Sequence, residues 1–153
     1  MKPPTTGFDW GTNEPLALLH FGFRAVVKEP DERLARLGLG RVHHRILFFI
    51  ARKPGLSVSE LIAVLGVTKQ ALNIPLRALT KKRLVRNAVN AENRRQRVLS
   101  LTPRGKALEA RLSGHQRALF AAAFRRAGAG AARGWACVMR ELAAPPERDQ
   151  RGP

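Results

Sequence analysis

The stretch "SVSELIAVLGVTKQALNIPLRAL" (57–79) carries the start and end signals of two consecutive short helices. Ser57 and Glu60 make a Ser-x-x-Glu capping box directly before an apolar run, which is typical of a helix start. Gly66 is placed to close that helix, and Thr68 can cap the one that follows. A short helix, a glycine-containing turn and a second helix form the helix-turn-helix pattern. Taken alone, the stretch leaves a plain pair of core helices open as the alternative.

The second helix, predicted over 68–81, has an apolar face of leucines and an opposite polar face. Glutamine, asparagine and arginine on the polar face can bond adenine and guanine edges in the major groove of DNA, and isoleucine can contact a thymine methyl group. A solvated polar face is the alternative. The residues predicted to contact DNA from this helix are Thr68, Lys69, Gln70, Asn73, Ile74, Arg77 and Lys81.

Pro75 lies in the middle of this helix, where proline removes one backbone hydrogen bond and crowds the carbonyl of Ala71. Because Pro75 lies toward the buried side, a full turn beyond the helix start, Gln70 and Asn73 precede it. We therefore predict a helix that bends near Ala71 to Pro75, with its N-terminal half in the groove and Arg77 re-aimed.

Two short strands are predicted directly after the helix-turn-helix, at Leu84–Ala88 and Val98–Leu101. They flank a polar tip, "NAENRRQR" (90–97), and together form a β-hairpin of the kind called a wing. Arginine-rich loops are usually only solvated, but one that follows a helix-turn-helix is placed to reach a minor groove or DNA phosphates. The candidates on the wing are Arg94, Arg95 and Arg97.

Apolar residues at helical spacing predict further helices on both sides of this core. Pro30 is expected to end the first of them, and Thr102-Pro103 supplies a cap and a proline for the start of a long one. The fold class is therefore mainly α with a small β-hairpin wing, a winged helix-turn-helix flanked by N- and C-terminal helices. The ranges outside the helix-turn-helix, in chain order, are 14–28, 31–37, 41–52, 103–127 and 131–143.

The charge of the chain predicts a polyanionic partner. Its 153 residues hold 28 Lys and Arg against 11 Asp and Glu, a formal net charge of +17. From Lys81 to Arg111 there are ten basic residues and two glutamates, a net charge of +8. Neutralising phosphates releases condensed counterions, so this distribution favours nucleic acid. An arginine-rich genome is the alternative source of the excess.

The composition also excludes several classes of protein. No apolar run reaches the ~18 residues that a membrane span needs, and the N-terminus lacks the apolar core of a signal peptide. A single cysteine, Cys137, excludes an intrachain disulfide framework and a multi-cysteine zinc site, so a reducing cytoplasm is expected. We expect Cys137 to be a buried, inert thiol; an oxidant sensor is the alternative. The motifs of nucleotide-binding loops and nucleophile elbows are missing, so no enzyme and no cofactor are predicted.

The stretch from Gly38 to Leu108 resembles the winged helix-turn-helix core of MarR-type bacterial transcription regulators. The matching pieces are "LGLGRVHHRIL" (37–47), "PGLSVSELIAVLGVTKQAL" (54–72), "LTKKRLV" (79–85) and "NAENRRQRVLSLTPRGKAL" (90–108). The resemblance implies a homodimer, held by the first and the last two helices, on a pseudo-palindromic operator. It also implies a repressor, and many members of the family respond to small aromatic or phenolic acids bound between the dimerisation and DNA-binding parts.

Three residues depart from the family's pattern. Asn93 stands where the wing usually has aspartate, so the usual ion pair with an arginine becomes at best a neutral hydrogen bond; Arg95 matches the wing arginine. Arg83 replaces the glycine of "KGLV", which costs about 1 kcal/mol if the backbone there is left-handed. Pro75 is the third departure.

The expected domain organisation follows from these patterns. It comprises a flexible N-terminus (1–12), a single domain (13–144) with a winged helix-turn-helix core at about 38–102 and dimerisation helices at about 13–29 and 103–143, and a flexible tail (145–153). The family's ligand site motivates a ligand-binding set of His20, Arg24, His43 and His44, beside Phe21 and Phe23. Capping or packing histidines are the alternative, and no metal site is predicted.

The sequence thus predicts a sequence-specific DNA-binding transcription regulator in the bacterial cytoplasm, associated with the nucleoid. We expect a dimeric repressor that a small ligand, such as an aromatic one, releases. An architectural, largely non-specific DNA-binding protein is the first alternative. A protein-interaction module that kept the winged-helix scaffold without operator reading is the second.

Overall fold

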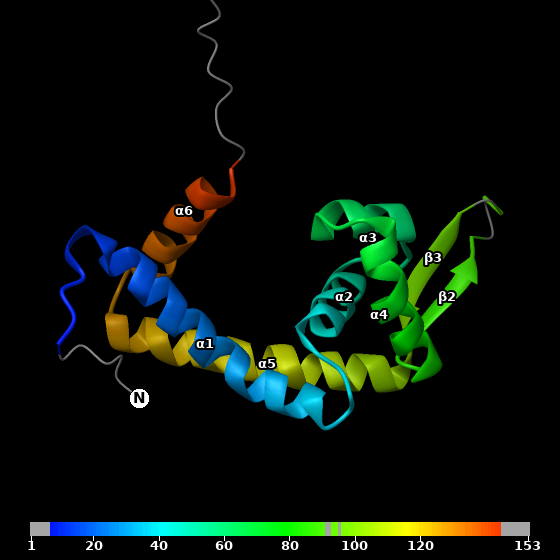
Figure 1. Cartoon of the computed structure of the whole chain (residues 1–153), viewed down its shortest axis with the longest axis horizontal. Helices are drawn as coiled ribbons and strands as arrows, with labels where there is room; N and C mark the ends of the chain where they lie inside the picture. Colours follow the sequence, from blue (N-terminus) through cyan, green and yellow to red (C-terminus); the bar gives the residue numbers. More distant parts are fainter. Residues whose placement is uncertain (1–6, 91–92, 95, 145–153) are drawn as a thin grey trace, which may run out of the picture. The chain divides into compact units, whose positions relative to one another are not determined.

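The structure, a computed structural model, describes residues 7–90, 93–94 and 96–144. They form two compact units, Met1–Gln116 and Arg117–Pro153, and helix α5 runs from the first into the second. Figure 1 shows the elements in chain order. These are the 3-10 helix η1 (Gly11–Asn13), the helices α1 (Glu14–Ala35), α2 (Arg41–Arg52), α3 (Val58–Leu65), α4 (Lys69–Lys81), α5 (Pro103–Ala127) and α6 (Ala131–Ala143), and the strands β1 (Leu56–Ser57), β2 (Val85–Val89) and β3 (Arg97–Leu101).

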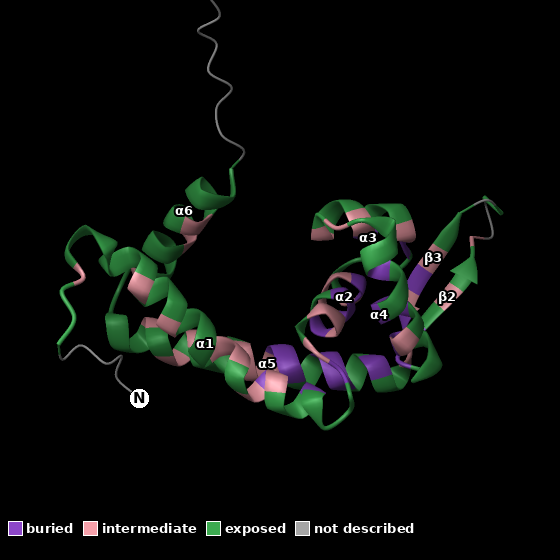
Figure 2. Ribbon diagram, in the orientation of Figure 1, coloured by how far each residue is buried: buried purple, intermediate pink, exposed green. Residues whose placement is uncertain are grey.

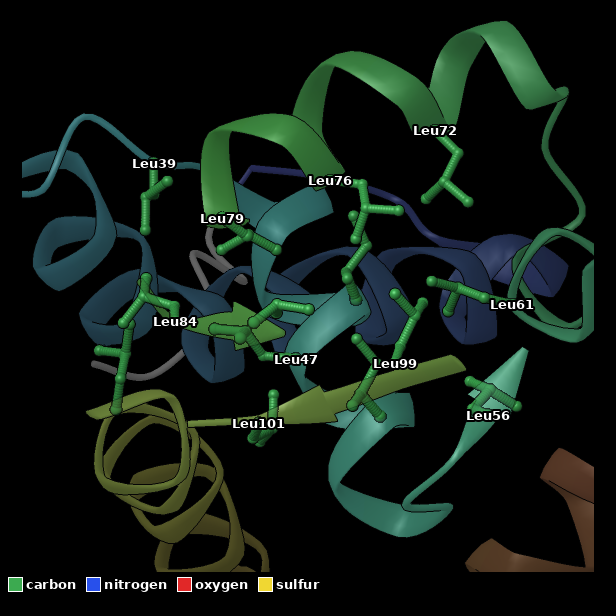
Figure 3. Close-up of a cluster of buried hydrophobic side chains, with 14 of the residues drawn as sticks. Leu39, Leu47, Leu56, Leu61, Leu72, Leu76, Leu79, Leu84, Leu99 and Leu101 are labelled. Carbon is green, nitrogen blue, oxygen red and sulfur yellow. The ribbon is translucent and has the colours of Figure 1, made fainter. Parts of the chain in front are cut away.

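The core of the first unit is built almost entirely from leucine, as expected for a chain poor in aromatic residues. Leucines from α2, α3, α4, β1 and β3, together with Leu84 just before β2, point toward one another in Figure 3. Leu72, Leu76 and Leu79 of α4 are buried, which confirms the predicted apolar face of that helix. Burying a leucine side chain stabilises a fold by about 1.5–3 kcal/mol, so these residues fix how α4 is rotated about its axis.

The hairpin and a third strand form a small antiparallel sheet in the order β1-β3-β2. The register pairs Val85 with Leu101 at the base of the hairpin and Val89 with Arg97 at its outer end. The predicted hairpin is confirmed. Strand β1 was not predicted, because a strand of two residues is too short to show an alternating pattern; Leu56 pairs with Leu99.

The base of the hairpin is tied to the start of α5 by the threonine predicted as its cap. The Thr102 hydroxyl donates to the Arg83 carbonyl (2.7 Å) and accepts from the Gly105 amide (3.0 Å). The Leu84 backbone lies so close to α5 that a Cβ atom on residue 105 would come within 2.0 Å of the Leu84 carbonyl oxygen. Only glycine fits there, so "TPRG" (102–105) fixes the hairpin against α5.

Pro30 does not end the first helix, and this prediction was wrong. Helix α1 continues through it to Ala35, so 31–37 is not a separate helix. Proline leaves the carbonyl of Val26 without its usual amide partner. In the structure the Gln116 side chain of α5 donates to that carbonyl through Nε2 (3.4 Å), while the Pro30 ring is buried. A tertiary hydrogen bond thus replaces the one that proline removes.

Helix α4 likewise continues through Pro75, whose ring is buried beside Leu72 and Leu76. The helix is not broken there, and the bend near Ala71 to Pro75 remains a prediction. Arg83, at the end of α4, has a φ of 55°, the left-handed backbone that the sequence analysis considered for this position. The chain therefore keeps the backbone typical of a glycine there and places an arginine on it.

Candidate nucleic-acid interface and a cavity beside it

The start of α3 and the turn between α3 and α4 both contain the predicted caps. The Ser57 hydroxyl accepts from the Glu60 amide (3.2 Å), and Glu60 Oε2 accepts from the Ser57 amide (2.8 Å). Gly66 adopts a φ of 62° after α3, a left-handed backbone that costs glycine no steric strain. Thr68 Oγ1 then accepts from the Ala71 amide (3.1 Å). These bonds satisfy amides that a helix start leaves without a partner, so the angle between the two helices is well defined.

The solvent-facing side of α4 carries all seven residues predicted to contact DNA from this helix. Each of them is exposed, from Thr68 to Lys81. Ile74 is 78% exposed, more than any other large hydrophobic side chain in the described part of the chain. The structure thus brings amide, guanidinium, ammonium and apolar groups together on one helix face, opposite the leucines.

The structure separates Arg94 and Arg97, two of the three arginines that the sequence placed on one tip. Arg94 is exposed in the turn between the strands. Arg97 lies instead in β3, where its Nε donates to Asn87 Oδ1 (2.8 Å) and its Nη2 to the Asn87 carbonyl (2.7 Å). Arg95 lies outside the described residues.

The charged side chains on this surface are all positive. No aspartate or glutamate occurs from Leu61 to Ala91, which covers α4 and β2. Lys81, Lys82 and Arg83 are exposed where α4 ends, and Arg86 is exposed on β2. A surface with this charge attracts phosphates at any pH at which DNA is stable.

A separate cavity of about 440 Å³ lies between α1, α2 and the first part of α5. Its apolar lining comes from aromatic and aliphatic side chains, and its polar lining from an acid, two arginines, a histidine and a glutamine. The lining residues are Phe23, Val27, Pro30, Asp31, Arg41, His44, Arg45, Phe48, Phe49 and Gln116. Asp31 is held by Arg41 (2.7 Å), whose guanidinium lies 5.2 Å from the centre of the Phe23 ring.

Of the four residues predicted to bind a ligand, only His44 lines this cavity. His43 caps α2 instead, since its Nδ1 accepts from the Gly40 amide (3.0 Å). His20 packs edge-on against Phe21, and Arg24 is exposed on α1. The structure does not bring the four together: neither His20 nor Arg24 on α1 lines the cavity, and His43 caps α2.

His44 is nine-tenths buried, and its Nε2 has no hydrogen-bond partner among the described residues. Burial lowers the pKa of His44, although Glu109 and Asp31 act in the opposite direction. The imidazole is therefore neutral near pH 7. A buried ring nitrogen without a partner loses hydrogen-bond energy, and a ligand group in the cavity can restore it.

Apart from Phe23, which was named beside the predicted set, sequence reasoning missed the rest of the cavity wall, although a signal was present. Arg41, His44, Arg45 and Phe48 recur at helical spacing along 41–52, on the side opposite Ile46, Leu47 and Ile50. Aromatic and cationic residues alternate on that face. Within the described ranges 7–90, 93–94 and 96–144, no group of three His, Cys, Asp or Glu side chains could hold a metal ion, and no helix is long and apolar enough to cross a membrane. Cys137 is exposed on α6, so the prediction of a buried thiol was wrong.

Comparison with known proteins identifies the fold. The sequence model of the MarR family matches residues 37–96. The HTH-type transcriptional regulator PetP of Rhodobacter capsulatus is 43% identical over 130 residues, which cover 85% of this chain and 78% of the relative. This chain belongs to the MarR family. It is a DNA-binding transcription regulator and not an enzyme, as the absence of catalytic motifs predicted.

Other members of the MarR family extend the comparison. The HTH-type transcriptional repressor Rv2887 of Mycobacterium tuberculosis is 35% identical over 98 residues, covering 63% of this chain and 70% of the relative. Two solved structures share the fold: the S. aureus MepR–DNA complex (TM-score 0.67, 15% identity, 83% of this chain and 92% of that chain) and the PcaV regulator from Streptomyces coelicolor in complex with its natural ligand (TM-score 0.64, 16% identity, 91% and 97%). The predicted winged helix-turn-helix fold is confirmed.

The capping box of α3 gives this MarR-family regulator a testable acid sensitivity. Bonds from Lys53 and Ser57 lower the pKa of Glu60 from 4.5 to about 2. A depressed carboxyl pKa stabilises the fold above the unfolded-state value and loses that contribution as the pH falls through the folded-state value. We expect the free energy of unfolding, measured in urea, to fall between pH 4.5 and about 2 partly through Glu60.

Glu60→Gln should reduce this pH dependence, because glutamine keeps the capping geometry and cannot titrate. Glu32→Gln, the same change at an exposed glutamate of α1, serves as the control. An identical pH profile for Glu60→Gln and the unmutated protein would contradict the assignment.

Proposed function

We propose that this MarR-family regulator is a dimeric repressor that reads a pseudo-palindromic operator with α4. The exposed face of α4 carries this proposal, because the helix buries its leucines and leaves Gln70, Asn73 and Arg77 in solvent. Those three side chain types form bidentate bonds with adenine and guanine edges. The assignment as a repressor is supported by the name of the 35% identical relative Rv2887.

The remaining predicted contacts divide into base-reading and phosphate-binding groups. Ile74 is an exposed apolar group suited to a thymine methyl, which favours base reading over the purely electrostatic binding of an architectural protein. Lys69 and Lys81 suit phosphates at the two ends of α4, and Thr68 lies at the helix start beside Lys69. On the wing, Arg94 and Arg95 are proposed to approach the minor groove or the backbone. A chromosomal operator places the protein at the nucleoid, in the cytoplasm.

The exposed apolar side of α1 supports a dimer. Leu16, Leu19 and Phe23 are spaced three and four residues apart and are 67%, 55% and 52% exposed. Helix α6, taken by itself, shows a similar row of Trp135, Val138 and Leu142. Figure 2 shows how little of either helix is buried. Contiguous apolar surface of this kind marks an interaction site, and a second copy of the chain offers matching surfaces.

The cavity between α1, α2 and α5 is the proposed effector site. Its volume of about 440 Å³ lies within the range of about 300–1,000 Å³ typical of small-molecule sites. Phe23, Phe48 and Phe49 suit an aromatic ring, while Arg45 and the unpartnered Nε2 of His44 suit an acid group and a hydrogen-bonding group. The solved PcaV regulator with its natural ligand supports an effector in this fold.

Base reading is tested by enriching genomic fragments on the purified protein. We expect a short inverted repeat with half-sites about one DNA turn (10–10.5 bp) apart. Arg77→Ala or Asn73→Ala should relax the preference at one position of each half-site, at a cost of about 1–3 kcal/mol on the specific sequence. Lys82→Ala, at an exposed cation outside the predicted set, is the control. An equal loss of affinity for the specific sequence and for random DNA would contradict the base-reading assignment.

The dimer is tested by the mass of the protein in solution. We expect size-exclusion chromatography with light scattering to give twice the chain mass of 16.9 kDa. Leu19→Asp should halve that mass, because it places a charge in the proposed apolar interface. Val64→Asp makes the same kind of change at an exposed apolar residue of α3 and should remain dimeric. A monomeric unmutated protein refutes the interface.

The effector site is tested with 4-hydroxybenzoate as a phenolic acid and 4-hydroxybenzamide as its neutral analogue. The acid should raise the thermal midpoint, since a ligand that binds only the folded state stabilises it, and should weaken operator binding. Val27→Phe fills the cavity and should abolish both effects, whereas Leu18→Phe, elsewhere on α1, should keep them. No response of the unmutated protein to the acid excludes this ligand class.

A further inference from the structure

The outer end of the wing extends beyond the core that holds its base. Val85 and Leu101, which pair at the base, are 2% and 8% exposed, whereas Val89, which pairs with Arg97 at the outer end, is 51% exposed. Apolar packing therefore cannot hold the two strands together near the tip. A two-stranded ribbon without a packed face is only marginally stable in water.

Two pairs of side-chain contacts close the ribbon where the core does not. Nearest the tip, the Asn90 side chain donates to Gln96 Oε1 (3.2 Å), beside a backbone bond from the Asn90 amide to the Gln96 carbonyl (2.8 Å). One step toward the base, Arg97 makes its two bonds to Asn87 (2.8 and 2.7 Å). The first pair joins the residue after β2 to the residue before β3, and the second joins the two strands themselves.

The geometry of the second pair directs Arg97 away from the tip. Asn87 pairs with Leu99 in the register, so Arg97 and Asn87 lie on the same face of the hairpin, two residues apart along the strands. To reach Asn87 the guanidinium folds back toward the base of the wing. Two of its five N–H groups, in the fork geometry that only arginine provides, are engaged by one residue.

We infer that Arg97 is a positioning residue of the wing, whose fork to Asn87 orders the ribbon and so places Arg94 for DNA. This inference rests on the proposed contact between the wing and DNA, and it changes the role that the sequence suggested for Arg97. An unordered wing would lose conformational freedom on binding and so lower the affinity. The two bonds from Arg97 to Asn87 order the wing in the free protein, so less conformational freedom is lost when DNA binds.

The test measures operator affinity as a function of salt for single variants and one double variant. Asn87→Ala removes the side-chain acceptor and leaves every charge in place. Arg97→Lys keeps the charge and loses the fork. Each should weaken binding about three- to ten-fold, the range for net loss of one ordinary intramolecular hydrogen bond, without changing the slope of log K against log salt. The double variant Asn87→Ala with Arg97→Lys should bind no more weakly than Arg97→Lys alone.

Arg94→Ala provides the reference for a direct phosphate contact and should reduce the salt slope by about 0.9. Amide hydrogen exchange of the free protein gives a second readout, because Asn87→Ala should speed exchange of the Asn90 amide and leave the core of α2 unchanged. Asn87→Asp, which keeps the acceptor oxygen, should restore slow exchange.

The outcomes separate the two proposals. If Asn87→Ala or Arg97→Lys binds DNA as well as the unmutated protein, the positioning role is refuted. The proposed wing contact still stands in that case if Arg94→Ala weakens binding. If Arg97→Lys weakens binding and Asn87→Ala does not, Arg97 contacts DNA directly and the inference fails. If none of the wing variants changes affinity, the wing does not reach the DNA and both proposals fail together.

Discussion

Burial along one side of α4 determines which side chains of this protein can reach DNA. Leu72, Pro75, Leu76 and Leu79 are buried against the rest of the core, so the rotation of the helix about its axis is fixed. A rotation by one residue would remove leucines from the core at a cost of about 1.5–3 kcal/mol each. Pro75 contributes to the buried side and needs no amide partner there. The residue that first looks incompatible with a recognition helix therefore helps to hold its reading face outward.

The predictable parts of the fold are those set by neighbouring residues. Ser57 with Glu60, Thr68 with Ala71, and Thr102 with Gly105 are separated by three residues, and the structure contains each of these bonds. Pro30 misled the sequence analysis, because Gln116 replaces the lost hydrogen bond from 90 residues away. No local pattern reveals a compensation of that kind.

In the candidate site, too, features set by neighbouring residues were predictable and features that depend on distant contacts were not. One helix face is enough to predict the exposed residues of α4, whereas the cavity needs α1, α2 and α5 to meet. Of the histidines chosen from the sequence, His44 lines it and His43 caps a helix, although they are adjacent in the chain. Arg97 was assigned to DNA by its charge, but its bonds to Asn87 depend on the strand register. Residue type indicates what a side chain can do, and tertiary contacts decide which of those roles is open to it.

Helix α2 physically links the cavity to the DNA-reading helix. One face lines the cavity through His44 and Phe48, and the opposite face is buried in the core that also holds α4 and β3. At its end, Arg52 lies 4.2 Å from the centre of the Phe48 ring and 2.8 Å from the buried carboxylate of Glu109 on α5. A buried carboxylate that loses its cation is strongly destabilised, so the position of Arg52 is closely constrained. Packed cores shift between discrete arrangements, and α4 packs against α2, so a ligand that shifts α2 through the cavity wall would also move the DNA-reading helix.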